Sequence, residues 1–166
     1  PVNAIRYLEA FPVLVDVDPA TATIDAAKLE RFLRESCTHA AGRVMNRRSG
    51  RRVRAILPVH LYGMPADLDR VWALGREFGL VVVEDAAECL GAKYKEKRVG
   101  SAGDIACLSF NGNKVITSGG GGMIVSGREE WIRRARHLIT QAKAHATEYL
   151  HDEVGYNYRM PNLNAA

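Results

Sequence analysis

Residues 81–123 read VVVEDAAECLGAKYKEKRVGSAGDIACLSFNGNKVITSGGGGM, and two apolar runs within them indicate neighbouring strands of a buried sheet. The first run ends in Glu84 and Asp85, and the second carries Ser109 at its end, with Lys114 a short turn later. Strands that are buried on both faces are apolar along their length, and ligands of such sheets bind beyond the carboxyl ends of the strands. These polar residues therefore mark an expected binding site.

A carboxylate, a hydroxyl and a lysine gathered at strand ends match the needs of one cofactor, pyridoxal phosphate. This cofactor needs a lysine amine for its internal Schiff base, an acid that keeps its ring nitrogen protonated, and donors for its phosphate. Four consecutive glycines, Gly119 to Gly122, follow Lys114 and leave room for a ligand or a second backbone. They lack the spacing of a dinucleotide fingerprint or a phosphate-binding loop, so a nucleoside triphosphate site is disfavoured.

Several motifs of the chain resemble the DegT/DnrJ family of nucleotide-sugar aminotransferases, which are pyridoxal phosphate enzymes of fold type I. The resemblance covers most of the sequence, because matching motifs lie both before and after the two strands. The motifs are VHLYG at 59–63, EDAAE at 84–88, GSAGD at 100–104, Ser109-Phe110 followed by Lys114, the glycine run, and GYNYRM at 155–160. Sugar dehydratases of the same family have histidine at the position of Lys114, so the lysine favours an aminotransferase.

The resemblance implies roles for four residues at the strand ends. Lys114 is the expected Schiff-base lysine, whose free amine would move a proton between the substrate carbon and the cofactor. Asp85 is the expected partner of the pyridinium nitrogen, and Ser109 the expected donor to the cofactor phosphate. Glu88 stands where the family usually has glutamine near the cofactor ring oxygen and is assigned to cofactor binding. Structural alternatives remain open: Lys114 as a surface lysine, Asp85 as a helix cap and Ser109 as a residue that ends a strand.

The resemblance also implies cofactor-binding residues near the end of the chain. Asn157 and Arg159 match residues that reach the cofactor phosphate of the neighbouring subunit, so a homodimer with sites at its interface is expected. A polar cluster in a tail is also common where the tail is simply solvated. His60 and Tyr62 match a family motif as well, but a histidine in a loop beside a sheet suits a structural role equally.

The reaction that the resemblance implies is transfer of an amino group from an amino acid, with glutamate expected, to a keto group of a nucleotide-linked sugar. Its expected place is the biosynthesis of surface polysaccharides or glycoconjugates. Residues 1–166 would then be part of the pyridoxal phosphate-binding large domain, without the segment before it or the small domain after it, and inactive alone. The alternatives are a noncatalytic or regulatory relative, or a piece that folds without cofactor.

The order of expected elements indicates an α/β fold. Strands that alternate with helices are joined by right-handed crossovers, so we expect a doubly wound, mostly parallel sheet flanked by helices. The expected strands are 11–17, 53–59, 79–83, 105–109 and 121–125; the expected helices are 1–8, 26–36 after the N-cap Asp25, 68–78 between Asp67 and Gly79, and 129–140. Residues 91–103 are expected to form an exposed turn or hairpin, and the tail from Gln141 to be irregular.

The composition is that of an ordinary globular protein. Apolar residues make up 47% of the 166 residues and charged residues 25%, and no apolar run approaches the roughly 20 residues that span a bilayer. A cytoplasmic protein with no membrane partner is expected. The net charge of +4 is concentrated in residues 43–54, which are expected to form a solvated loop without nucleic-acid contacts. Cys37, Cys89 and Cys107 lack metal-ligand spacing, so we expect free buried thiols and no metal site.

Overall fold

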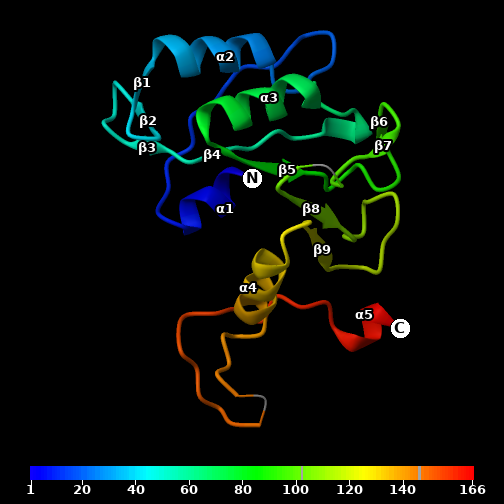
Figure 1. Ribbon diagram of the computed structural model, residues 1–166. Helices are drawn as coiled ribbons and strands as arrows, with labels where there is room; N and C mark the ends of the chain where they lie inside the picture. Colours follow the sequence, from blue (N-terminus) through cyan, green and yellow to red (C-terminus); the bar gives the residue numbers. More distant parts are fainter. Residues whose placement is uncertain (102, 146) are drawn as a thin grey trace.

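A four-stranded sheet is the central element of the computed structural model, which describes residues 1–101, 103–145 and 147–166 (Figure 1). The strands lie in the order β4 (Ala55–Ile56), β5 (Val81–Asp85), β8 (Ile105–Ser109) and β9 (Gly122–Val125). The first three are parallel, and β9 runs antiparallel to β8. The expected α/β fold with a mostly parallel sheet is therefore confirmed.

Two amphipathic helices lie together on one side of this sheet (Figure 1): α2 (Ala26–Glu35) and α3 (Leu68–Phe78). The Asp25 carboxylate accepts two backbone N–H groups at the start of α2, and the Asp67 carboxylate accepts the N–H of Arg70 at the start of α3. Gly79 ends α3 with a φ of 62°, a left-handed conformation that glycine adopts without steric cost. Both helices were predicted from these caps and from their apolar spacing, and both predictions are confirmed.

The larger hydrophobic core lies between these helices and the strands. Leu33 of α2 and Val71 of α3 are completely buried, and Val82 of β5 packs in the same cluster. Burial of each large apolar side chain contributes about 1.5–3 kcal/mol. The fully buried or nearly buried members are Leu29, Leu33, Cys37, Val44, Ile56, Val71, Leu74, Leu80 and Val82. This core anchors β5, whose carboxyl end carries part of the candidate site.

The remaining elements are short. The expected hairpin within 91–103 is confirmed as β6 (Lys93–Tyr94) and β7 (Lys97–Arg98). The others are α1 (Val2–Tyr7), the 3-10 helix η1 (Leu61–Gly63), α4 (Glu129–Ile139) and α5 (Asn162–Ala165). The tail after α4 is largely irregular, as expected, and ends in α5 (Figure 1). Across the described parts of the chain, no helix is both long and apolar enough to cross a membrane.

The basic run 43–54 differs from its prediction. Much of it belongs to a three-stranded antiparallel sheet made of β1 (Cys37–Ala40), β2 (Arg43–Asn46) and β3 (Arg52–Val53). Val44 is nearly fully buried in the larger core, while its arginine neighbours stay exposed. Val53, which pairs with Val44 across β2 and β3, packs against the same core. These two valines define the inner face of the sheet, so the expectation of a solvated loop was wrong.

Two expected strands also differ from the structure. Residues 11–17 form no strand; a single bridge joins Val17 to Ile24, and Leu14 is exposed. An apolar run becomes a strand only where a neighbouring strand supplies hydrogen-bond partners, and within the described residues none lies along this segment. The run 53–59 is divided between β3 and β4, because the chain leaves one sheet at Arg54 and enters the other at Ala55.

Candidate active site

The carboxyl ends of β5 and β8 bring Asp85 and Ser109 to the same edge of the sheet. Asp85 pairs with Cys107 across the parallel strands, and Ser109 lies two residues beyond Cys107, on the same face. The backbone carbonyl of Asp85 accepts the N–H of His60 at 3.0 Å. The Asp85 side chain accepts the N–H of Ala87 through Oδ1 at 3.2 Å, and within the described residues Oδ2 has no partner. One carboxylate oxygen is therefore available to a ligand.

Lys114 lies in the turn after β8, and its amine points toward Glu88. Nζ is 3.4 Å from Oε1 of Glu88, and the two side chains are only 17% and 30% exposed. The other carboxylate oxygen, Oε2, accepts the backbone N–H of Tyr62 at 2.6 Å. The Tyr62 N–H, and after it the Lys114 ammonium, hold the pKa of Glu88 below its ordinary value. Glu88 is thus an anion at neutral pH, and the amine lies beside a fixed negative charge.

Ser109 has a hydroxyl that is free to donate. Its Oγ accepts the N–H of Asn111 at 3.3 Å, while its own O–H has no acceptor in the part of the chain that the structure describes. The neighbouring glycine run serves close packing. A Cβ on Gly122 would lie 2.6 Å from the carbonyl oxygen of Leu108. The expectation that these glycines admit a second backbone is confirmed at Gly122.

Glu84 and His60 form a buried pair behind this edge. Glu84 precedes Asp85 in β5 and therefore points to the opposite face. Its Oε2 lies 3.1 Å from Nε2 of His60, and neither side chain has any exposed surface. The sequence predicted that Glu84, like Asp85, belongs to the binding site; the structure instead buries its side chain behind that edge. A carboxylate inside an apolar strand must find a partner when buried, and His60 is that partner. For His60, the structure favours the structural alternative over direct ligand contact.

The tail residues Asn157 and Arg159 are not brought to the other candidate residues. Asn157 bridges to Thr140 just after α4, and both Asn157 and Arg159 are exposed. Within the described residues, no hydrogen bond or ion pair joins them to any of the four candidates at the strand ends. The tail does touch the glycine run, because Met160 lies against Gly121. Their roles toward a neighbouring subunit remain predictions.

The three cysteines are free, but they are not all buried. Cys37 and Cys89 are buried, whereas Cys107 is exposed on the face that carries Asp85 and Ser109. The expectation of three buried thiols is therefore wrong for Cys107, because a residue near a strand end can face outward even inside an apolar run. Desolvation by its surroundings and then the negative charge of Asp85 raise the pKa of the Cys107 thiol.

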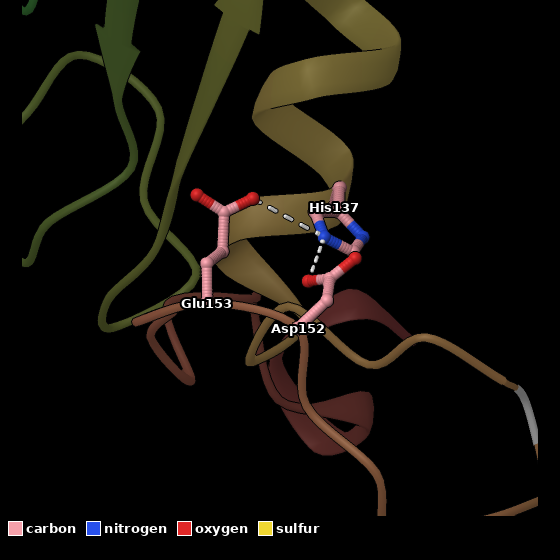
Figure 2. Close-up of side chains that lie close together, drawn as sticks. All are labelled: His137, Asp152 and Glu153. Carbon is pink, nitrogen blue, oxygen red and sulfur yellow. Dashed lines mark hydrogen bonds and ion pairs between the residues drawn. The ribbon is translucent and has the colours of Figure 1, made fainter.

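Figure 2 shows a second polar group, formed by His137 of α4 with Asp152 and Glu153 of the tail. Nε2 of His137 lies 2.8 Å from Oδ1 of Asp152 and 3.4 Å from Oε1 of Glu153. The three ligand atoms are close enough to hold a metal ion. However, Arg134 donates to both carboxylate oxygens of Glu153, with Nη2 2.6 Å from Oε2. A cation is already present, so the geometry favours an ion-pair network that ties the tail to α4.

The chain is similar to known proteins along nearly all of its length. The GDP-perosamine synthase of Caulobacter vibrioides is 43% identical over 164 residues, which are 99% of this chain and 40% of the relative. The crystal structure of a DegT DnrJ EryC1 StrS aminotransferase from Brucella abortus has a TM-score of 0.86 and 27% identity, covering 99% of this chain and 42% of that one. The structure of NtdA from Bacillus subtilis, with bound cofactor PMP, has a TM-score of 0.80 and 27% identity, covering 98% and 33%.

These similarities agree with the motifs and with the fold. The chain spans about two fifths of the length of the curated relatives it matches. Residues 1–166 match the family described as DegT/DnrJ/EryC1/StrS aminotransferase. On this match, which runs from the first residue to the last, the chain belongs to the DegT/DnrJ/EryC1/StrS aminotransferase family.

Proposed function

We propose that the protein is a pyridoxal phosphate-dependent aminotransferase that moves an amino group from an amino acid, glutamate by expectation, to a keto group of a nucleotide-linked sugar. Family membership supports the reaction type. The name of the Caulobacter relative, a GDP-perosamine synthase, supports a sugar carried on a nucleotide. We further propose that the product enters surface polysaccharides or glycoconjugates.

The observation that carries the proposal is the amine of Lys114 at the sheet edge, 3.4 Å from the Glu88 carboxylate. The same edge carries Asp85 and Ser109, so an amine, an acid and a hydroxyl donor share one side of the sheet. Open α/β sheets bind their ligands at this edge. The candidate residues therefore lie where a cofactor would be held, on rigid strand ends and the turns that follow them.

The chemistry of these side chains fits pyridoxal phosphate. Lys114 would hold the cofactor covalently through Nζ, and the unpartnered oxygen of Asp85 would accept a hydrogen bond from the ring nitrogen. The free hydroxyl of Ser109 would donate to the phosphate. Glu88, placed beside Lys114, would lie near the ring oxygen of the cofactor. When bound, pyridoxal phosphate supplies an electron sink that stabilises negative charge on the substrate carbon.

The residues of this chain would then divide the work of proton transfer. As a free amine, Nζ of Lys114 would be the base that accepts a proton from the substrate carbon and, once protonated, the acid that gives that proton back. The negative charge of Asp85 would keep the ring nitrogen of the bound cofactor protonated. Glu88 accepts the Tyr62 N–H and holds its second oxygen toward Lys114. Each of these roles is a proposal for the named atom.

The partners follow from the same proposal. We infer that the protein acts as a homodimer, in which Asn157 and Arg159 of one subunit reach the cofactor phosphate of the other. Both side chains are exposed, which supports an intermolecular role. The proposed substrates are a nucleotide sugar and an amino-acid donor, and the proposed location is the cytoplasm, without nucleic-acid or membrane partners.

Absorbance spectroscopy tests the proposal. Pyridoxal phosphate is added to the full-length protein and to its Lys114→Ala variant, and glutamate is then added to each. The wild type is expected to develop a lysine-bound cofactor band that glutamate converts to the spectrum of the aminated cofactor. A wild type that behaves like Lys114→Ala in both steps would instead indicate a noncatalytic relative.

A further inference from the structure

The buried His60–Glu84 pair connects three separate segments behind the candidate site. His60 follows β4, Glu84 lies in β5, and the N–H of Gly100, which follows β7, donates to Oε2 of Glu84 at 3.1 Å. His60 Nε2 lies 3.1 Å from that same oxygen. Neither side chain has exposed surface, so neither can touch a substrate. Any influence on the site must pass through the residues that they hold.

The hydrogen bonds of His60 define its tautomer. Nδ1 lies 3.2 Å from the backbone nitrogen of Ala66, and that N–H can only donate. Nδ1 therefore carries the lone pair, and the ring proton lies on Nε2, directed at Glu84. The imidazole thus uses both nitrogens: one anchors the ring to β5, and the other closes residues 60–66 into a loop.

The loop closed in this way carries Tyr62, which connects it to the site. Tyr62 has φ 52° and ψ 30°, a left-handed conformation that costs a non-glycine residue free energy and persists only where its surroundings impose it. In this conformation its N–H donates to Oε2 of Glu88 at 2.6 Å. The other oxygen of Glu88 faces the Lys114 amine. A continuous path therefore runs from Glu84 to Lys114.

We propose that the buried His60–Glu84 pair is a positioning device for Glu88. By closing the 60–66 loop it aims the Tyr62 N–H at Glu88 and so holds that carboxylate beside Lys114. The importance of this placement for cofactor capture rests on the proposed function, in which Lys114 binds the cofactor. The placement of Glu88 itself is independent of the proposed function, because it concerns hydrogen bonds within this chain.

A second observation supports tight placement of Glu84. Oε1 is buried and has no hydrogen-bond partner among the described residues. A Cβ on Gly103 would collide with this oxygen. The carboxylate is therefore held on one oxygen by two donors, while its other oxygen is confined by the backbone. A rigid anchor of this kind is what a loop needs if its conformation is to be reproducible.

Amide hydrogen exchange in the cofactor-free protein tests the positioning. The variants are His60→Asn, too short to reach Glu84, and Glu84→Gln, which keeps the size but gives His60 and Gly100 a neutral and therefore weaker acceptor. Each is expected to speed exchange of the Tyr62 amide at least about tenfold, because that amide would lose its fixed acceptor. Glu88→Ala, which deletes the acceptor, serves as the positive control. Leu33→Ala, a core variant in α2, is the control for general loss of stability: it is expected to speed exchange of core amides without a selective effect on the Tyr62 amide.

Covalent capture gives the second readout. Pyridoxal phosphate is added, trapped with borohydride at timed intervals, and located by peptide mapping. His60→Asn and Glu84→Gln are expected to slow capture at Lys114 about tenfold without moving it to another lysine. Capture at another lysine in the wild type would refute the proposed function while leaving the exchange result intact.

Three results would overturn the positioning role. The first is a folded His60→Asn or Glu84→Gln variant whose Tyr62 amide exchanges as slowly as in the wild type. The second is unchanged capture at Lys114 despite a released Tyr62 amide. The third needs no variant: nitrogen NMR of the wild type that finds the His60 proton on Nδ1 would contradict the loop closure, even if both variants failed to fold.

Discussion

The Nζ atom of Lys114 lies 3.4 Å from Oε1 of Glu88, although the two residues are 26 positions apart in the chain. The turn after β5 supplies the carboxylate, and the turn after β8 supplies the amine. Adjacent parallel strands place these two turns at the same edge of the sheet. In the proposed enzyme, the negative charge nearest to the cofactor lysine thus comes from Glu88.

Replacement of Lys114 by alanine is expected to abolish covalent binding of pyridoxal phosphate and to lower turnover by at least about 10²-fold, because the amine serves both attachment and proton transfer. Borohydride reduction followed by peptide mass mapping measures the attachment. Lys93→Ala is the matched control, since Lys93 is exposed in the β6–β7 hairpin. Labelling of Lys93, Lys95 or Lys143 in place of Lys114 would refute the assignment.

Much of the fold follows from local signals in the sequence. The helices α2 and α3 were predictable because Asp25, Asp67 and Gly79 mark their ends and their apolar residues recur at helical spacing. The edge that carries Asp85 and Ser109 was predictable because buried strands show continuous apolar runs. These features depend on residues close together in the chain.

Other features depend on contacts that no local pattern encodes. The sheet β1–β2–β3 was missed because its strands are polar and short, with Val44 the inward residue of β2. The contact between Lys114 and Glu88 depends on how the turn after β5 and the turn after β8 are placed relative to each other. The His60–Glu84 pair depends on where the loop after β4 passes β5. Such pairings come from tertiary packing and could not be deduced from spacing.

Asp85→Asn is expected to leave pyridoxal phosphate bound while nearly abolishing transamination. The amide keeps the size of the side chain but lacks the negative charge that favours a protonated ring nitrogen. Equilibrium dialysis measures the bound cofactor, and a glutamate half-reaction measures turnover. Asp25→Asn makes the same chemical change at the start of α2, where asparagine caps as well as aspartate, and is expected to be silent. Near-normal turnover of Asp85→Asn would contradict the role.

The same Asp85→Asn variant is expected to make Cys107 more reactive. Desolvation and the charge of Asp85 both raise the pKa of this thiol, so removing the charge lowers the pKa and increases the thiolate fraction. Alkylation by iodoacetamide at pH 8, followed by mass spectrometry, measures the rate. Cys89 is the internal reference: burial, then Glu88, Glu84 and Asp85, raise its pKa to about 11, and it should stay unlabelled. Equal alkylation rates of Cys107 in the wild type and in Asp85→Asn would show that the charge of Asp85 does not affect the pKa of the Cys107 thiol.

Glu88→Gln is expected to lower stability in a pH-dependent way. The Tyr62 N–H and the Lys114 ammonium depress the folded-state pKa of Glu88 below its ordinary value of 4.5. A depressed carboxyl pKa contributes stability above the unfolded-state pKa, and this contribution is lost as the pH falls through the folded-state value. The wild type should therefore unfold at a higher thermal midpoint than the variant at pH 7. The difference between the two midpoints should decrease below about pH 4.

Thermal unfolding of the wild type and Glu88→Gln at several pH values provides the measurement. Glu30→Gln is an informative comparison, because Glu30 also has a lowered pKa, through Arg34 and then Arg70, on the exposed side of α2. Its loss should affect stability without changing capture of pyridoxal phosphate at Lys114. If the difference in thermal midpoint between the wild type and Glu88→Gln were the same at pH 7 and pH 3.5, the two donors would not stabilise the ionised form of Glu88.

Gly122→Ala is expected to destabilise the protein by about 1–3 kcal/mol, the usual cost of forcing extra volume into a packed site. The new Cβ would lie 2.6 Å from the Leu108 carbonyl oxygen, and both atoms belong to paired strands that cannot move independently. Gly127→Ala is the matched control, because nothing lies within 4 Å of a Cβ at that position. Urea unfolding of the two variants measures the difference in free energy of unfolding.

The effect of Gly122→Ala should extend to the candidate site, because Gly122 pairs directly with Ser109 across β8 and β9. Separation of the two strands would shift the Ser109 hydroxyl away from the phosphate that it is proposed to bind. Affinity for pyridoxal phosphate should therefore fall in Gly122→Ala and stay unchanged in Gly127→Ala. If both variants bound the cofactor equally while only Gly122→Ala lost stability, Ser109 would be a residue that ends a strand and would have no part in holding the phosphate.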